Sequence, residues 1–175
     1  MLRYRLLCEK CIIQIGIALH FGFPVLFYSR GFIMLKGISP LMSPELLATL
    51  YEMGHGDEII LADAHFPGHS VNDHVIRADG LTVPQMLDAI LPLINLDAAV
   101  DAPVMMMAVQ KGDIADPGVE PSFREVIDKY HPKTPAIKRI DRFEFYEQAK
   151  KAFCVVMTGE TRTYGNIILK KGVTK

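Results

Sequence analysis

The chain has 175 residues, of which 50% are hydrophobic, and a formal net charge of −1 at pH 7. That length suits one domain around one core, and the near-neutral charge gives no electrostatic footprint for nucleic acid. The three cysteines, Cys8, Cys11 and Cys154, are too few for a disulfide framework and favour a reducing, cytoplasmic location. Cys8 and Cys11 form a lone C-x-x-C, which lacks the further ligands that a zinc site needs.

The first 33 residues differ from the rest in their pattern of apolar and charged residues. Their apolar stretch follows two arginines, as in a signal peptide, but Gln14, His20 and Pro24 interrupt it, and a membrane span needs about 20 mostly apolar residues. We expect Met34 to be the true start and residues 1–33 to be an upstream extension of the reading frame; a signal anchor is the alternative. A native protein whose intact mass includes the extension would contradict this expectation.

A helix and a strand open the globular pattern. Residues 43–53 predict a helix, because Ser43 is a good N-cap, Pro44 fits the first turn and apolar side chains recur on one face. We expect Gly54 to end this helix in the left-handed conformation, which glycine adopts without steric cost. Residues 58–62 (EIILA) predict a buried strand of the kind found in sheets that are covered on both faces.

Strands and helices alternate through the rest of the chain. After a loop over 66–73, we expect a helix over 82–94, a strand over 103–110, a helix over 123–131, a strand over 136–140, a helix over 141–152, and strands over 153–160 and 164–173. This alternation predicts one layered α/β domain with a mixed sheet over residues 34–175.

Titratable side chains stand at both ends of the predicted 58–62 strand. His55 lies in a Gly-His-Gly turn and is a candidate proton shuttle, because histidine titrates near neutral pH; a solvated turn histidine is the alternative. Asp63 follows the carboxyl end of the strand, where α/β sheets present groups to ligands. Its carboxylate can accept hydrogen bonds from two hydroxyls, and the alternative is a cap of its own loop.

Two later segments carry groups suited to a sugar. Arg142 and Tyr146 are four residues apart on the predicted 141–152 helix, so a guanidinium and an aromatic ring share one face. The alternative is an ordinary amphipathic helix on which Arg142 pairs with an acid. Gly165 lets the backbone approach a ligand closely, and Asn166 offers both a donor and an acceptor.

The sequence lacks the usual cofactor motifs. Neither G-x-G-x-x-G nor a P-loop is present, so a nucleotide cofactor has no support. His65 and His69 are four residues apart, but the intervening Phe-Pro-Gly disfavours the helix that would turn both toward a metal. A metal-dependent hydrolase built on these histidines and Asp63 is an alternative. We expect cofactor-free proton transfer on a polar small molecule.

Several ordered blocks carry a resemblance to a known family. The segments SPELLATLYEMGHGDEIILADAHFP, IRADGL, RIDRFEFYEQAKKAF and YGNIILKKGV resemble the L-fucose mutarotase branch of the family that also contains D-ribose pyranase. The resemblance runs from Met34 to Lys175. It implies a three-layer αβα fold, ring-shaped decamers with sites at subunit boundaries, and cofactor-free interconversion of the α and β anomers of L-fucose.

The resemblance also implies roles for individual residues. His55 in G-H-G-D would be the catalytic proton donor, and Asp97 in N-L-D matches a further position. The substrate ligands would be Asp63, Arg142, Tyr146, Tyr164, Gly165 and Asn166. D-ribose pyranases carry G-H-T-D, a histidine in place of Arg142, and Y-A-N instead of Y-G-N, so the chain resembles the fucose branch. A D-ribose pyranase and a non-catalytic monosaccharide-binding protein are the alternatives.

The spacing of His55 and Asp63 has a geometric consequence. They are eight residues apart, and an extended chain would separate them by about 26 Å, which is too far for one monosaccharide. Either the Gly-His-Gly turn folds back, or the site combines residues from two subunits. The implied assembly favours the second explanation.

Overall fold

A mixed sheet of six strands organises residues 35–174, which are the residues that the computed structural model describes. The predicted extension over residues 1–33 lies outside the described residues. The strands are β1 (Glu58–Ala62), β2 (Val75–Ala78), β3 (Val104–Met107), β4 (Lys138–Ile140), β5 (Cys154–Thr158) and β6 (Ile167–Lys170), and their order in the sheet is β2-β5-β1-β6-β3-β4. Strand β6 runs antiparallel to both of its neighbours, while the other pairs are parallel.

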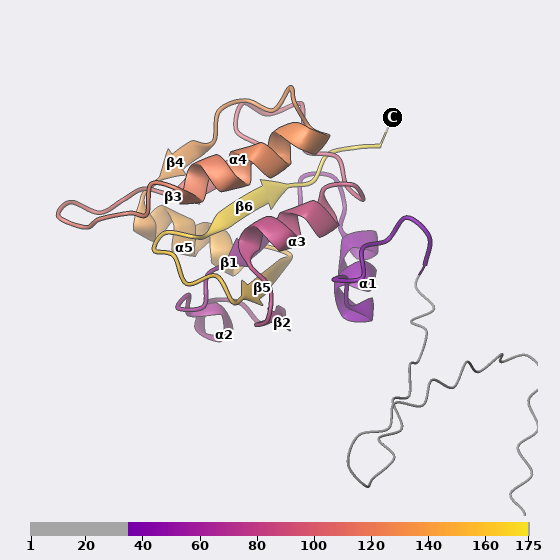
Figure 1. Cartoon of the computed structure of the whole chain (residues 1–175), viewed down its shortest axis with the longest axis horizontal. Helices are drawn as coiled ribbons and strands as arrows, with labels where there is room; N and C mark the ends of the chain where they lie inside the picture. The colour runs from indigo at the N-terminus through magenta and orange to yellow at the C-terminus, as the bar shows by residue number, and fades with distance from the viewer. Residues whose placement is uncertain (1–34, 175) are drawn as a thin grey trace, which may run out of the picture. The chain divides into compact units, whose positions relative to one another are not determined.

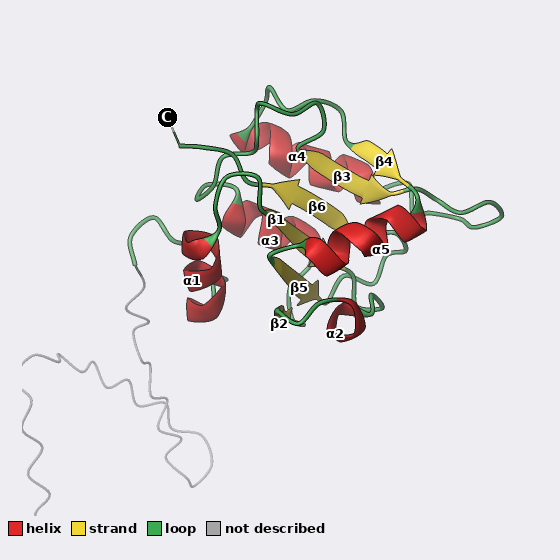
Figure 2. Cartoon of the chain, turned by 180° about the vertical axis from the view of Figure 1, so that it is seen from behind, coloured by secondary structure: helices red, strands yellow, loops and turns green. Residues whose placement is uncertain are grey.

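Helices cover both faces of this sheet. Helices α1 (Pro44–Glu52), α3 (Val83–Ile90) and α4 (Val119–Tyr130) pack with one face, and α2 (Gly68–Val71) and α5 (Arg142–Lys151) lie on the other. Figure 1 views the α3 and α4 side, and Figure 2 shows α5 across the opposite face. The predicted three layers and mixed sheet are confirmed. Among the described residues, none of the helices has the length and apolar character to cross a membrane.

Strand β1 shows why both faces of the sheet must be covered by helices. Ile59 and Leu61 point into the core beneath α3 and α4, whereas Ile60 and Ala62 point into the core beneath α5. Side chains alternate along a strand, so a strand that is apolar at consecutive positions must be buried on both faces. The prediction of a buried strand over 58–62 is therefore confirmed.

The end of α1 differs from the expected one. Ser43 caps its start, since its Oγ accepts a hydrogen bond from the Leu46 N–H (3.1 Å), as predicted. The helix ends at Glu52, with Met53 as its C-cap, and Gly54 is not in the left-handed region. The expectation for Gly54 was therefore wrong. The Gly54 N–H donates to the Asp57 carboxylate (2.7 Å), and this side-chain hydrogen bond holds the turn without a left-handed glycine.

Three elements were missed or shortened by sequence reasoning. Strand β2 is an edge strand that pairs only with β5, so it needs little apolar sequence, and of its residues only Ile76 is buried. Helix α2 lies inside the predicted 66–73 loop and is a single turn, which is too short for a periodic pattern. Helix α4 begins at Val119, earlier than predicted, because Pro121 falls in its first turn, where proline is tolerated.

The strand directions define two edges of the sheet. Because β6 runs against β1 and β3, its first residue lies beside their carboxyl ends. We call this side, with the residues that follow β1, β3, β4 and β5 and precede β6, the carboxyl edge. The amino edge is the opposite side, with the residues that precede β1 and β3 and follow β6.

Candidate active site

Asp63 and Asn166 form a buried pair at the carboxyl edge. The Asp63 N–H donates to Asn166 Oδ1 (2.8 Å), and Asn166 Nδ2 donates back to Asp63 Oδ2 (2.6 Å). Both residues are less than a tenth exposed. The pairing follows from the register of β1 and β6, in which Leu61 lies opposite Ile167. One Asn166 N–H and the remaining Asp63 lone pairs are left to bind hydroxyl groups.

Burial is the main influence on the acidity of the Asp63 carboxyl group. Burial raises its pKa above the usual value, and hydrogen bonds from the His65 N–H and the Asn166 amide only partly oppose this effect. The carboxyl group is thus less acidic than an exposed aspartate. It follows the carboxyl end of β1, as predicted.

Helix α5 brings two more predicted residues to the same edge. Asp141 follows β4 and caps the helix by accepting from the Phe143 N–H (2.8 Å), so Arg142 lies in the first turn. The Arg142 guanidinium carbon is 5.5 Å from the centre of the Tyr146 ring, which confirms that the two share a face. Within the described residues, Arg142 forms no ion pair, in contrast to the amphipathic alternative.

An aromatic contact connects this helix with the segment after β1. The rings of Tyr146 and Phe66 have their centres 5.6 Å apart, and Phe66 also packs edge-on against Phe145 (5.8 Å). Phe66 is three residues beyond Asp63, and its N–H donates to the Asp63 carbonyl oxygen (3.2 Å). The apolar wall around Tyr146 is therefore continuous with the turn that carries the carboxylate.

Tyr164 is held by a loop that sequence reasoning did not connect with the site. Its hydroxyl donates to the Asp113 carboxylate and accepts from the Gln110 N–H (3.1 Å). The bond to Asp113 raises the pKa of Tyr164, so the phenol stays neutral. With these two bonds made, the oxygen has one lone pair left for a ligand hydroxyl. No local motif marks Gln110 or Asp113, which are more than 50 positions away in the chain.

His55 and Asp97 form a second group, at the amino edge. His55 Nε2 lies 3.1 Å from Asp97 Oδ2, with the imidazole half-exposed and the carboxylate buried. The Ala99 N–H, which donates to Asp97 Oδ1 (3.0 Å), and then His55 lower the pKa of Asp97. An ionised carboxylate can only accept, so Nε2 carries the hydrogen and Nδ1 is left to take a proton.

A cavity of about 400 Å³, which is within the usual size of small-molecule sites, lies beside Asp97. Its lining includes Asp97, Pro103, Tyr130, His131 and Lys133. The cavity gives Asp97 a ligand-sized neighbouring space at the amino edge.

The two groups lie at opposite ends of β1. A five-residue strand spans about 13 Å, and His55 and Asp63 lie beyond its two ends. Within one chain, the structure therefore does not bring His55 together with the carboxyl-edge residues. The alternative metal ligands Asp63, His65 and His69 do not gather either: among residues 35–174, no three acidic, histidine or cysteine side chains are arranged to hold a metal ion.

Comparison with known proteins adds independent information. A model of the RbsD / FucU transport protein family matches residues 36–174. An L-fucose mutarotase of Haemophilus influenzae (strain 86-028NP) is 56% identical over 141 residues, which are 81% of this chain and 98% of that protein. The crystal structure of the fucose mutarotase from Streptococcus pneumoniae in complex with L-fucose matches with a TM-score of 0.77 and 47% identity, over 81% of this chain and all of that one. The structure of Bacillus subtilis RbsD complexed with D-ribose matches over 81% of this chain and all of that one, with a TM-score of 0.60 and 24% identity, so it supports the fold alone.

Proposed function

The chain belongs to the RbsD / FucU transport protein family, and from this membership we propose that it is an isomerase that interconverts the α and β anomers of L-fucose. The observation that carries the proposal is the 56% identity to an L-fucose mutarotase over nearly all of that protein. The alternative, D-ribose pyranase activity, has weaker support, because the ribose-bound relative is 24% identical.

Mutarotation needs two proton transfers and no cofactor. One group removes the proton of the anomeric hydroxyl while another protonates the ring oxygen; the bond between C1 and the ring oxygen breaks and an open-chain aldehyde forms. Rotation about the C1–C2 bond and the reverse transfers close the ring on the other face. Each positioned acid or base typically contributes about 10²–10⁴-fold. We assign one transfer to Nδ1 of His55, and Tyr146 or a water molecule is the counterpart.

The carboxyl edge supplies the sugar ligands in this proposal. Asp63 and Asn166 bind hydroxyls with the lone pairs and the N–H that their mutual pairing leaves over. Arg142 contributes a guanidinium without an acidic partner among the described residues, and the Tyr146 ring contributes an apolar face. Tyr164 offers its remaining lone pair, and the backbone of Gly165 approaches the sugar.

The separation of the two groups leads to a proposal about assembly. We assign each site to two copies of the chain: the His55–Asp97 pair of one copy faces the carboxyl edge of another, in a ring-shaped homodecamer. In this arrangement His55 and Asp63 of one chain belong to two different sites, as expected if each site combines residues from two subunits. We also propose that residues 34–175 are the working unit and that the protein acts in the cytoplasm.

Saturation-transfer proton NMR on the two anomers of L-fucose tests the proposed activity. With EDTA present and D-ribose measured in parallel, we expect accelerated exchange between the L-fucose anomers and less effect on D-ribose. Acceleration with D-ribose alone would favour the pyranase alternative. Absence of exchange with both sugars would contradict an enzymatic role and leave a sugar-binding protein.

A further inference from the structure

The loop over residues 159–166 joins β5 to β6 and carries three of the proposed sugar ligands. The Ala64 N–H donates to the carbonyl oxygen of Glu160 (2.8 Å), which ties the start of the loop to the residue after Asp63. Near its end, Tyr164 has a φ of 62°, in the left-handed region that residues other than glycine rarely adopt. Such a conformation persists only where surrounding contacts hold it.

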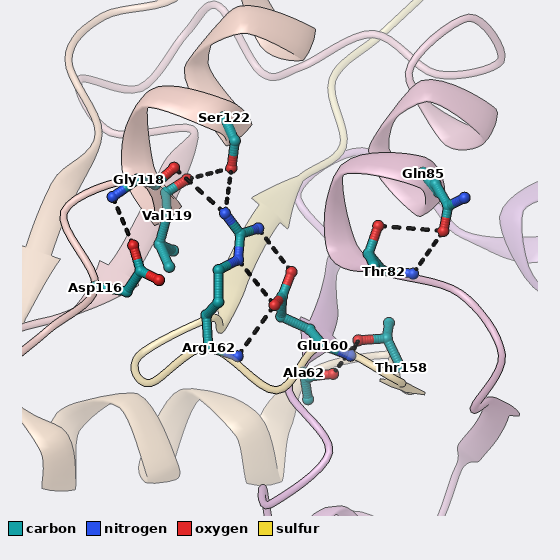
Figure 3. A network of polar contacts seen from close by, with 10 residues as sticks. All are labelled: Ala62, Thr82, Gln85, Asp116, Gly118, Val119, Ser122, Thr158, Glu160 and Arg162. Atoms are coloured by element: carbon teal, nitrogen blue, oxygen red, sulfur yellow. Dashed lines mark hydrogen bonds and ion pairs between the residues drawn. The ribbon is translucent and has the colours of Figure 1, made fainter.

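An ion pair within the loop supplies such contacts (Figure 3). Arg162 Nε donates to Glu160 Oε1 (2.9 Å), Nη2 donates to Oε2 (2.7 Å), and the Arg162 backbone N–H also donates to Oε1 (3.1 Å). Glu160 is 3% exposed, so its buried carboxylate needs the bidentate hydrogen bonds from Arg162 to compensate for the loss of water. The Glu160 side chain lies directly against Gly165, where an added Cβ would be 2.7 Å from Glu160 Cγ.

Arg162 also connects the loop with the start of α4. Its Nη1 donates to Ser122 Oγ (3.2 Å) and to the carbonyl oxygen of Gly118 (3.4 Å), as Figure 3 shows. Gly118 ends the 108–118 segment, and that segment contacts the Tyr164 hydroxyl. One guanidinium therefore connects the two segments that hold Tyr164 in place.

We propose that Glu160 and Arg162 are positioning residues for the substrate: their ion pair holds the 159–166 loop in the conformation that presents Tyr164 and Asn166 to the sugar. The inference rests on the proposed function and assigns the pair no contact with substrate. An ion pair with only a structural role would change stability and leave the KM unaffected. The inference predicts a change in KM.

Arg124 provides a matched control for Arg162. Its side chain is 27% exposed, against 29% for Arg162, and it also binds a carboxylate, that of Asp128. Its other partners are the backbone carbonyl oxygens of Thr134 and Pro135, where Arg162 has one carbonyl oxygen and one hydroxyl. None of these partners lies in the 159–166 loop. The test compares R162Q, R162K and R124Q in the full chain, with KM and kcat measured by anomer exchange of L-fucose and Tm by thermal unfolding.

We expect R162Q to raise the KM about tenfold and to lower kcat/KM by about ten- to a hundredfold, because misplaced ligands weaken sugar binding. R162K keeps the charge without the fork and should give an intermediate KM, while R124Q should lower Tm and leave the KM unchanged. A wild-type KM in folded R162Q would overturn the inference. If R162Q does not fold, a wild-type KM in R162K would overturn it. A wild-type protein without exchange would overturn the proposed function and this inference together.

Discussion

At the residue scale, carboxylates and their partners decide what the candidate groups can do. The Asp97 carboxylate accepts from His55 Nε2, which leaves Nδ1 of the imidazole to face the substrate in the proposed mechanism. Asp63 lies in a buried site that raises its pKa, and Asn166 uses both its oxygen and one N–H on that residue. The two aspartates therefore have different roles in the proposed mechanism: the Asp97 carboxylate orients the His55 imidazole, and the Asp63 carboxyl group binds hydroxyls of the sugar.

Replacing His55 tests the base directly. We expect H55N and H55F to lower kcat by about 10²–10⁴-fold while sugar binding stays measurable, because the carboxyl-edge ligands are unchanged. Anomer exchange and equilibrium binding of L-fucose measure the two effects. The control is H69N, since His69 is exposed and outside the proposed site. Near-normal turnover in H55N would refute the assignment, and loss of activity in H69N would favour a metal site.

At the element scale, the 159–166 loop shows how close packing specifies one residue. A Cβ at Gly165 would lie 2.7 Å from Glu160 Cγ and 2.9 Å from the Arg162 carbonyl oxygen, and real Cβ atoms essentially never come that close to another atom. This crowding is a physical reason for glycine in the Y-G-N motif of this chain. Both neighbouring residues, Tyr164 and Asn166, are proposed sugar ligands, so a shift of the loop at Gly165 would displace them.

Substitution of Gly165 by alanine tests this packing. We expect G165A to destabilise the fold by about 1–3 kcal/mol, as overpacking does, and to lower kcat/KM for L-fucose. The matched control is G80A, because a Cβ at Gly80 would meet no atom within 4 Å, and it should be neutral or stabilise by about 0.4–1 kcal/mol. Denaturant unfolding measures the stabilities of both variants, and anomer exchange measures their kcat/KM for L-fucose. Equal stabilities of G165A and G80A would show that the loop yields easily.

At the scale of the whole molecule, the sheet separates the two halves of the proposed site. His55 and Asp97 are at the amino edge, and the sugar ligands are at the carboxyl edge. Because β1 is a rigid, fully paired strand between α-helical layers, local motion of one chain does not bring these edges together. The site that we propose therefore combines residues of two copies of the chain.

Complementation between inactive variants tests this requirement. H55N damages the amino edge and R142Q the carboxyl edge, and Arg142 is exposed, so both variants should fold. After co-expression in equal amounts, we expect exchange activity near a quarter of the wild-type level, roughly the fraction of sites that combine two intact edges. A mixture of H55N with H55F, which damages one edge twice, should stay inactive. Mixed oligomers without recovered activity would show that each site belongs to one chain.

Much of the fold could be predicted because its signals are local. The capped start of α1, the apolar run of β1 and the shared face of Arg142 and Tyr146 each depend on residues within a few positions of one another. Edge strand β2 and the one-turn helix α2 escaped prediction for the complementary reason. Their conformations depend on partners, β5 for the strand and the sheet face for the helix, more than on their own apolar pattern.

The sequence by itself determined the kinds of chemistry present: a histidine near a strand's start, an aspartate at its end, and an arginine and a tyrosine on one helix face. Only the tertiary structure decided which of these groups meet. Asp63 and Asn166 are 103 positions apart and touch, whereas His55 and Asp63 are eight apart and lie at opposite edges. The physical reason is that an extended strand separates near neighbours in the chain, while antiparallel pairing brings distant ones together.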